Sequence, residues 1–381
     1  MALLFMDSFD HYATADITEK WTAITTVVNG IGKAPIIGAY GRNGTSGLRT
    51  ATAGGGTDVA LGPTITVAPT GGVCLFGAAL KYANLSAFAV YPCGKEAWKG
   101  GGVGEGSNYI VRCFNNNDAL WFARVNTDGT ISVLRDPGTT SCVVLGTTTN
   151  ALQAGVFAYV ELKVTVHDST GTVDVRINGE AGLSLTGQNT RGTGASNAWT
   201  NLRVGYMAMD PPTTVNTLDI DDLVAMDGSG ARNNAFLGDV TIGCLHPDAD
   251  GNSHAWVLST GTPDNNEDYL CVDEALVNDD TDYISTATVN AKSTFSMQDV
   301  AAGANVKAVQ IVTAQRKAAE GPGLIKHVVR SNSTDYDLTE QGIGGTSYAF
   351  LRSVVEVDPA TSAAWTESGF NSVEIGIKKT G

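Results

Sequence analysis

Residues 156–180, VFAYVELKVTVHDSTGTVDVRINGE, decide the fold class of this 381-residue chain. Apolar and polar side chains alternate strictly over residues 160–167, and the alternation resumes in residues 172–177. A period of two over this length predicts two half-buried β-strands. The residues between them, Asp-Ser-Thr-Gly, supply turn chemistry. The stretch therefore predicts an antiparallel hairpin.

The register of this hairpin follows from a four-residue loop, which pairs His167 with Thr172 and Val166 with Val173. A slip by one residue would set every apolar side chain against a polar one, so the pattern specifies which face is buried. Lys163 then lies opposite Arg176, and two facing cations are tolerated only where water reaches them. One wet face and one buried face form the unit of an antiparallel sandwich.

The rest of the chain supports an all-β protein. Hydrophobic residues make up 43% of it, which excludes global disorder, and charged residues only 17%, alongside 45 glycines. More than ten short strands are expected at turn-punctuated spacing, with a helical turn near Trp21 and another within residues 314–319. This pattern predicts a β-sandwich or jelly roll.

Two domains are expected, because composition turns small and polar at residues 228–235, GSGARNNA. We place the first domain at residues 1–232 and a smaller β domain at residues 233–381. The net charge of −15 is uneven: residues 236–381 hold 20 acidic and 9 basic residues. The second domain is therefore predicted to be an acidic domain used in assembly or docking.

Charge and hydropathy exclude several partners. An acidic surface repels phosphate backbones and anionic membranes, so nucleic acid and membrane surfaces are not expected to bind. No apolar stretch is long enough to span a bilayer, and the start, MALLFMDSFD, is unlike a secretory signal. The six cysteines are expected to be buried free thiols in a reducing compartment, with oxidation involving Cys93 as the alternative.

Residues 160–180 resemble the penultimate hairpin of concanavalin-A-like, laminin-G-type jelly rolls. Residues 218–230, LDIDDLVAMDGSG, resemble the closing strand of the same fold. The resemblance implies an N-terminal jelly-roll sandwich, followed here by a smaller β-sandwich domain.

Four stretches, together with DIDDLVAMDGSG, make the whole chain resemble structural proteins of tailed bacteriophages. They are LLFMDSFDHY at residues 3–12, NNAFLGDVTIGCLHPDADGNSHAW at 233–256, VDEALVNDDTDYIST at 272–286, and EVDPATSAAWTESGFNSVEIGIKKTG at 356–381. The resemblance implies a non-enzymatic tail, fibre, baseplate or decoration protein, located in the virion as a homo-oligomer with other virion proteins as partners. The alternative is a carbohydrate-binding host-adsorption protein that binds a cell-surface glycan, with residual glycan hydrolysis.

No catalytic constellation is expected. Glycoside hydrolysis needs two carboxylates flanking the scissile bond. Asp219 and Asp221 share a face of one predicted strand but have no accompanying glutamate, so we interpret them as structural. Glu161 and Glu180 have no acidic neighbour at a suitable spacing and are interpreted as solvated. The chain is predicted not to be an enzyme.

No metal or cofactor site is expected either. Residues 248–252, Asp-Ala-Asp-Gly-Asn, place oxygen ligands at alternate positions, as calcium loops do, but an Asp-Gly turn has the same sequence. The five histidines show no metal-ligand spacing.

Two sets of binding residues are proposed from the sequence. Trp98 and Trp199 lie in predicted loops, where each ring either stacks on a sugar or tucks under its own loop. Apolar residues interspersed with acids in the long predicted loops of residues 246–304 are expected to form an assembly interface. These interface residues are Tyr269, Leu270, Val272, Leu276 and Val277.

Overall fold

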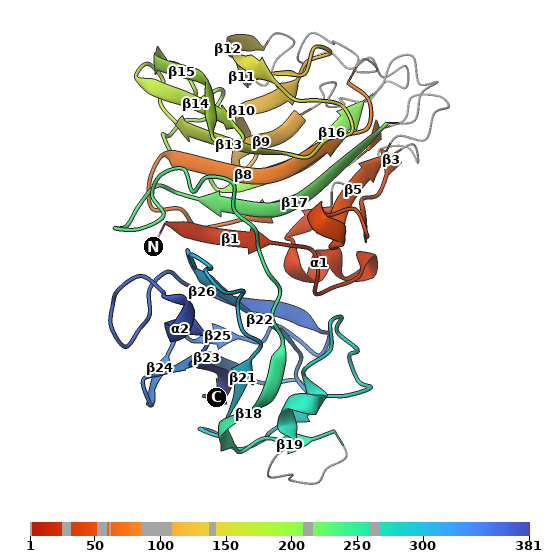
Figure 1. Ribbon diagram of the computed structural model, residues 1–381, viewed down its shortest axis with the longest axis vertical. Helices are drawn as coiled ribbons and strands as arrows, with labels where there is room; N and C mark the ends of the chain where they lie inside the picture. The colour runs from red at the N-terminus through yellow and green to blue at the C-terminus, as the bar shows by residue number, and fades with distance from the viewer. Residues whose placement is uncertain are drawn as a thin grey trace. The chain divides into compact units, whose positions relative to one another are not determined.

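The computed structural model describes residues 2–24, 32–51, 59–60, 62–85, 109–136, 142–208, 216–259 and 267–381. Across these residues almost every regular element is a strand, which confirms the predicted all-β class. The chain forms two compact units (Figure 1). Unit 1 contains residues 1–9 and 13–242, and unit 2 contains residues 10–12 and 243–381.

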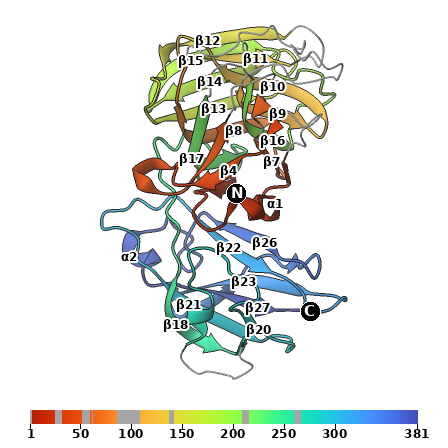
Figure 2. The same cartoon turned by 90° about the vertical axis from the view of Figure 1, so that its right-hand side faces the viewer.

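Unit 1 contains two sheets, antiparallel except for the parallel pairing of β3 with β6 (Figure 2). The first runs in the order β15-β14-β13-β8-β17-β5-β4, and β1 also pairs with β17. Its strands are β15 (Glu180–Gln188), β14 (Gly171–Ile177), β13 (Ala158–Thr165), β8 (Val73–Tyr82), β17 (Thr217–Met226), β5 (Gly47–Ala51), β4 (Ile36–Gly38) and β1 (Leu3–Asp7).

The second sheet runs in the order β12-β11-β10-β9-β16-β6-β3, and β7 joins β16 to β2. Its strands are β12 (Val143–Ala151), β11 (Thr130–Arg135), β10 (Asp118–Val125), β9 (Tyr109–Asn115), β16 (Asn201–Ala208), β6 (Val59–Ala60), β3 (Gly32–Lys33), β7 (Pro63–Thr66) and β2 (Ala23–Ile24). The two sheets meet in a core where the thiol of Cys74 contacts that of Cys113.

The hairpin β13–β14 is present, but its predicted register was wrong by two residues. Val164 pairs with Val173 rather than with Val175, and Lys163 faces Asp174 rather than Arg176. A shift of two keeps the same side chains on the buried face, so the core pattern alone could not detect it. The observed register replaces a pair of like charges with opposite ones, which is the more stable arrangement.

The longer loop of this hairpin is organised by His167. Its Nδ1 atom accepts hydrogen bonds from the backbone N–H groups of Ser169 (3.1 Å) and Thr170 (3.0 Å). These two bonds satisfy turn amides that would otherwise have no partner in the hairpin ladder. The imidazole therefore stabilises a six-residue connection between the paired Thr165 and Thr172, in place of the expected four-residue one.

The start of unit 1 is fixed by a buried ion pair at the end of β1. Asp7 and Lys20 have side chains 0% and 1% exposed, and Lys20 Nζ lies 2.9 Å from Asp7 Oδ1. The same carboxylate accepts hydrogen bonds from Phe9 N–H and Trp21 Nε1–H, both at 2.9 Å. Both oxygens of Asp7 are therefore satisfied. The helical turn predicted near Trp21 is present as α1 (Ile17–Lys20).

Unit 2 has a main sheet in the order β18-β21-β27-β23-β24, and β25 also pairs with β23. Two two-stranded sheets, β22–β26 and β19–β20, complete it. The strands are β18 (Pro247–His254), β21 (Lys292–Met297), β27 (Glu374–Lys379), β23 (Leu324–Ser331), β24 (Thr334–Asp337), β25 (Gln341–Gly342), β22 (Val309–Gln315), β26 (Ala349–Val355), β19 (Val257–Leu258) and β20 (Ile284–Ser285). The helical piece predicted within residues 314–319 was wrong, because β22 runs to Gln315.

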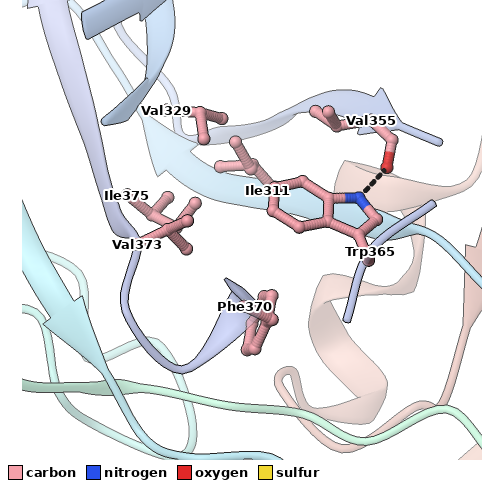
Figure 3. Close-up of a cluster of buried hydrophobic side chains, with 7 residues drawn as sticks. All are labelled: Ile311, Val329, Val355, Trp365, Phe370, Val373 and Ile375. Atoms are coloured by element: carbon pink, nitrogen blue, oxygen red, sulfur yellow. Dashed lines mark hydrogen bonds between the residues drawn. The ribbon is translucent and has the colours of Figure 1, made fainter. Parts of the chain in front are cut away.

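The core of unit 2 forms where β22 and β26 face the main sheet (Figure 3). The Trp365 indole lies at its centre, packs edge-on against Phe370 and donates a 3.0 Å hydrogen bond to the Val355 carbonyl. The buried members of this cluster are Ile311, Val329, Val355, Trp365, Phe370, Val373 and Ile375. A short helix, α2 (Glu367–Phe370), carries the Phe370 ring into the cluster.

A polar group also lies inside unit 2. His327 on β23 is 0% exposed; its Nε2 is 2.8 Å from the Thr313 hydroxyl, and its Nδ1 is 2.8 Å from the Ser353 hydroxyl. Burial lowers the pKa of His327 to about 4, so the imidazole is neutral at pH 7. The two hydroxyls satisfy a ring that would otherwise be costly to bury.

The substitution Asp7→Ala tests the buried ion pair. It leaves the Lys20 ammonium buried without this carboxylate, so we expect unfolding to become easier by about 3–5 kcal/mol. Urea unfolding monitored by tryptophan fluorescence measures this loss. Asp248→Ala, at an exposed position, is the control and should change stability by less than about 0.5 kcal/mol. Equal effects from the two variants would contradict the assigned role of Asp7.

The substitution His327→Gln tests the buried imidazole through pH. Between pH 6.5 and 4 the unfolded chain binds a proton at His327 and the folded chain does not, so stability falls with falling pH. Across this window the loss is about 3 kcal/mol in unit 2. Hydrogen exchange of β23 amides should show the loss in the wild type and a flatter dependence in the variant. An unchanged pH dependence in the variant would refute this assignment.

Candidate functional site

The outward face of the nine-stranded sheet is identified by its register. Cys113 pairs with both Leu202 and Trp121, and its contact with Cys74 of the other sheet places this row in the core. Cross-strand partners share a face and successive residues alternate faces. The next row, in which Arg112 pairs with both Arg203 and Phe122, therefore points away from the core.

Guanidinium groups gather on this outward face. Arg112 and Arg203 both stack on the ring of Phe114, at 4.9 Å and 5.1 Å from its centroid. Arg124 lies two residues after Phe122 on β10 and so projects from the same face. Burial lowers the pKa of Arg124, although an arginine remains charged at neutral pH. We call Arg112, Arg124 and Arg203 the arginine face.

The arginine face is held in place by polar neighbours. Arg112 Nε donates to Asp136 Oδ2 at 2.8 Å, and Arg203 Nε donates to the Thr64 hydroxyl at 3.3 Å. A guanidinium presents a rigid fork of donors that matches a carboxylate or sulfate group. This face therefore carries three guanidiniums together with the carboxylate of Asp136, which is ion-paired with Arg112 at 2.6 Å.

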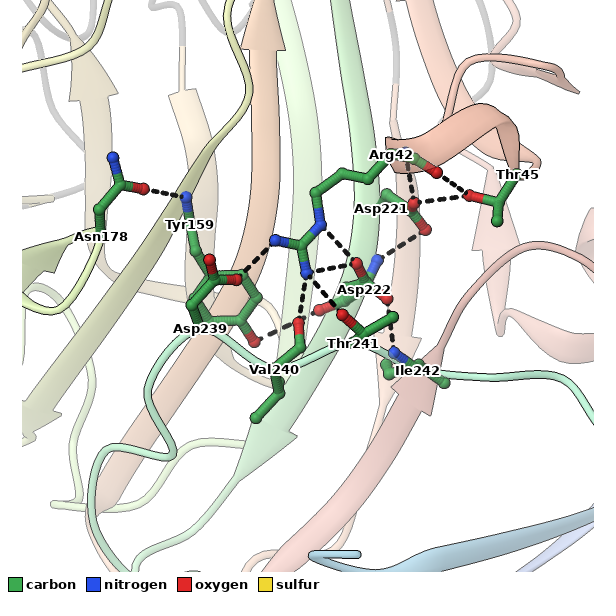
Figure 4. Close-up of polar contacts among 10 residues, drawn as sticks. All are labelled: Arg42, Thr45, Tyr159, Asn178, Asp221, Asp222, Asp239, Val240, Thr241 and Ile242. Carbon is green, nitrogen blue, oxygen red and sulfur yellow. Dashed lines mark hydrogen bonds and ion pairs between the residues drawn. The ribbon is translucent and has the colours of Figure 1, made fainter. Parts of the chain in front are cut away.

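A second polar cluster lies on the eight-stranded sheet, around Asp221 and Asp222 of β17 (Figure 4). Asp222 adopts a positive φ of 50° where the register of β17 shifts against β8. Asp221 Oδ2 accepts hydrogen bonds from Arg42 N–H at 2.8 Å and from the Thr45 hydroxyl at 3.1 Å. The bulge thus turns two consecutive carboxylates toward one loop.

Arg42 joins this cluster to residues 236–242, which we call the strap. Its guanidinium contacts Asp222 at 2.7 Å, Asp239 at 2.5 Å and the Val240 carbonyl. Asp222 Oδ1 also accepts a hydrogen bond from Ile242 N–H at 2.6 Å. As Figure 4 shows, the guanidinium lies between carboxylates from β17 and from the strap. Arg42 therefore clamps the strap to the sheet.

Two further contacts hold the strap. Gly238 N–H donates to Glu161 Oε1 at 3.0 Å, and Arg176 stacks on the Phe236 ring at 4.4 Å. Glu161 is consequently buried, so its interpretation as a solvated residue was wrong, whereas Glu180 is exposed as expected. The strap also explains why unit 1 extends to residue 242, beyond the predicted boundary at residue 232.

The carboxylates of this cluster are enclosed. Asp221 is 2% exposed and Asp222 1% exposed. Burial and the neighbouring Asp222 raise the pKa of Asp221 to about 7, in spite of the hydrogen bonds that it accepts. A carboxyl group with this pKa can exchange protons near neutrality, but little of its surface is open to a polymer substrate. The geometry assigns the cluster a structural role.

Asp219 has a structural role as well, as the sequence predicted. Arg49 binds its carboxylate with two hydrogen bonds of 2.6 Å and 2.9 Å, and Lys81 Nζ lies 2.9 Å from it. The Arg49 guanidinium in turn stacks on the Tyr40 ring at 3.7 Å. The buried charge is thus compensated by two cations.

The two tryptophans chosen from the sequence have different outcomes. Trp98 lies outside the described residues. Trp199 is 0% exposed and its indole N–H donates a 2.9 Å hydrogen bond to the Val73 carbonyl. The ring therefore cannot stack on a sugar, and the alternative of a tryptophan tucked into the protein is the one observed.

The predicted assembly residues lie in and after a 3-10 turn, η4 (Asp268–Cys271). Leu270 and Leu276 are 44% and 48% exposed, whereas Tyr269, Val272 and Val277 are half-buried. The interface stays a prediction for all five. Residues 248–252 lie within β18 rather than in a loop, and Asp250 accepts a hydrogen bond from Tyr269 N–H. The calcium-loop pattern is therefore part of a strand.

Among the described residues there is neither a candidate metal site nor a candidate membrane-spanning helix. Among them, no group of three or more His, Cys, Asp and Glu side chains could hold a metal ion. Within the same part of the chain, no helix has the length and apolar character of a membrane span. Cys74, Cys113, Cys244 and Cys271 form no disulfide, but Cys142 is disulfide-bonded, so the expectation of reduced thiols was wrong for that residue.

Comparison with known proteins gives similarity at the level of the fold. No family model and no curated protein matches the chain. A solved structure of the alginate lyase Aly36B is 13% identical, with a TM-score of 0.39 over 59% of this chain and 96% of that one. Lectin I from Ulex europaeus, bound to the methyl glycoside of α-L-fucose, is 10% identical, with a TM-score of 0.37 over 59% and 97%. SCLam, a non-specific endo-β-1,3(4)-glucanase of family GH16, is 13% identical, with a TM-score of 0.36 over 59% and 90%.

These matches correct two expectations from the sequence. The structures just named are a lyase, a lectin and a glucanase, and none is a virion protein. The expectations of a non-enzymatic virion component and of a protein without enzymatic activity therefore run against the matched structures, which are a lyase, a lectin and a glucanase. At these identities the likeness concerns the sandwich architecture alone.

The substitution Asp221→Asn tests the enclosed carboxyl group. Between pH 4 and 7 the folded chain keeps a proton on Asp221 that the unfolded chain has lost, so stability falls as pH rises, by at most about 1.4 kcal/mol per unit. Hydrogen exchange of β17 amides should show this fall in the wild type and a smaller one in the variant. Asp248→Asn, at an exposed position, is the control. Identical slopes in Asp221→Asn and wild type would disprove the assignment.

Proposed function

We propose that unit 1 binds carbohydrate on the arginine face, and that it prefers sugars carrying carboxylate or sulfate groups. The observation that carries the proposal is the row formed by Arg203 and Arg112 on adjacent strands, with Arg124 on the next strand. A row of guanidiniums across a sheet offers repeated anion-binding positions to an extended polymer.

The chemistry of the face supports this preference. The formal net charge of the chain is −15, whereas the arginine face has three guanidiniums against one ion-paired carboxylate, that of Asp136, and is locally positive. Such a local field raises the concentration of an anionic ligand near the face and speeds its association. Arginine also pairs with carboxylate and sulfate through two parallel hydrogen bonds, which gives orientation as well as affinity.

The neighbours of the arginines suit a sugar. Asn201 and Thr66 pair on this face, and Asn201 Nδ2 donates to the Thr66 hydroxyl at 2.9 Å. Amide and hydroxyl groups of this kind can exchange hydrogen bonds with sugar hydroxyls. The ring of Phe114 holds the two planar guanidiniums close to each other, since both stack on it. The face therefore combines charge recognition with neutral polar contacts.

The substitution Arg203→Gln tests the proposal with the least disturbance, because glutamine can still donate to the Thr64 hydroxyl. Titration calorimetry would compare a polyuronate with a neutral β-glucan of equal length. We expect the wild type to bind the polyuronate more tightly and the variant to lose about tenfold in affinity, which corresponds to one charge-assisted hydrogen bond. Raising the salt concentration should weaken wild-type binding.

Arg232→Gln is the matched control, because it removes the same charge at an exposed position outside the sheet. It should leave the affinity for the polyuronate unchanged. Equal affinity of the wild type for the charged and the neutral polymer, or equal losses in both variants, would contradict the proposal. Assaying the same mixtures for cleaved polymer shows whether binding is accompanied by catalysis.

A further inference from the structure

A thiol and an imidazole meet just before β18, in unit 2. The residues are Cys244 and His246, and Cys244 Sγ lies 3.6 Å from His246 Nε2, within hydrogen-bonding range for sulfur. Both side chains are half-buried, so solvent molecules reach them. A nucleophile within hydrogen-bond reach of a base is the arrangement that activates cysteine. Neither residue belongs to the arginine face.

The position of His246 is fixed by its backbone. Its N–H donates to Gln298 Oε1 at 3.2 Å, and its carbonyl accepts a 3.0 Å hydrogen bond from Gln298 N–H. Leu245, between the two reactive residues, packs against the buried core of unit 2. With both the backbone and the intervening side chain anchored, the imidazole stays beside the thiol.

We propose that Cys244, activated by His246, is a nucleophilic thiol of unit 2 and a site at which the protein forms mixed disulfides with small-molecule disulfides. His246 Nε2 takes the thiol proton, and the thiolate attacks one sulfur of the reagent. The S–S bond of the reagent breaks as the new S–S bond to Cys244 forms. The leaving thiolate takes up a proton from solvent or from the imidazolium, so no further oxidant is needed.

The other described free thiols provide an internal comparison. Cys74 and Cys113 are 0% exposed in the core of unit 1. Cys271 is half-buried like Cys244, but burial and the carboxylate of Asp282 raise its pKa to about 12. A neighbouring acid suppresses the thiolate, whereas a neighbouring imidazole favours it. The structure therefore ranks Cys244 above Cys271 in reactivity at equal burial.

The experiment treats the full-length protein with oxidised glutathione at pH 7 and maps the modified cysteines by peptide mass spectrometry over time. Each unit of thiol pKa changes the rate about threefold, after thiolate fraction and nucleophilicity are combined. Cys244 should then react about 100-fold faster than Cys271. Cys244→Ser should abolish the fast reaction, and Cys271→Ser should leave it unchanged. A reaction at Cys271 as fast as at Cys244 would overturn the proposal.

His246→Gln separates activation from mere exposure. It should slow modification of Cys244 about three- to tenfold at pH 7 and move the pH–rate profile toward that of an ordinary thiol. His254→Gln, which alters the other histidine nearby in sequence, should leave rate and profile unchanged. An unchanged profile in His246→Gln refutes the role of the imidazole. If that variant does not fold, the pH–rate profile for modification of Cys244 in the wild type is the test. A midpoint of that profile below about pH 8.5 supports the proposal, and a midpoint at or above this pH refutes it.

Discussion

The guanidinium of Arg42 is the contact on which the outer side of the eight-stranded sheet depends. It lies against two carboxylates, Asp222 and Asp239, which are 180 and 197 residues away from it in the sequence. Without Arg42, the adjacent carboxylates of Asp221 and Asp222 on β17 would be enclosed next to each other and would lack this compensating cation. The strap would also lose its strongest attachment, although the Glu161 and Phe236 contacts would remain.

This arrangement shows a general constraint on burying acids. Desolvation of Asp221 and Asp222 costs free energy that only hydrogen bonds and a nearby cation can offset. Asp222 receives both, and Asp221 receives hydrogen bonds but keeps its proton up to about pH 7. The bulge at Asp222 is therefore a position of local strain that the surrounding contacts hold in place.

Alternation of apolar residues was sufficient to predict the strands, since burial on one face is a local property of sequence. The same signal could not set the register of β13–β14, because the buried face is identical after a shift of two residues. Nor could it reveal that Gly238 covers Glu161, since small polar residues read equally well as a linker. Long-range contacts leave no short-range pattern.

The arginine face was missed for the same reason. Arg112 and Arg203 lie in separate strands, and only the pairing of β9 with β16 sets them side by side. The thiol–imidazole pair was different: Cys244 and His246 are two residues apart, so a search for cysteine and histidine at close spacing would have found it. The spacing rules for metal ligands do not select such a pair, because a nucleophile and its base need only one thiol and one imidazole.

The pairing of β1 with β17 determines the stage of synthesis at which unit 1 can close. Leu3 pairs with Met226, so β1 lacks its partner strand until β17 has been made. The packing partner of His11 is synthesised later still, because the His11 ring packs against Phe350 within unit 2. Unit 1 can close only after β17 has been made, and unit 2 needs both residues 10–12 and the residues from 243 onward. Such late closure favours slow folding and a period in which apolar strands are exposed to chaperones.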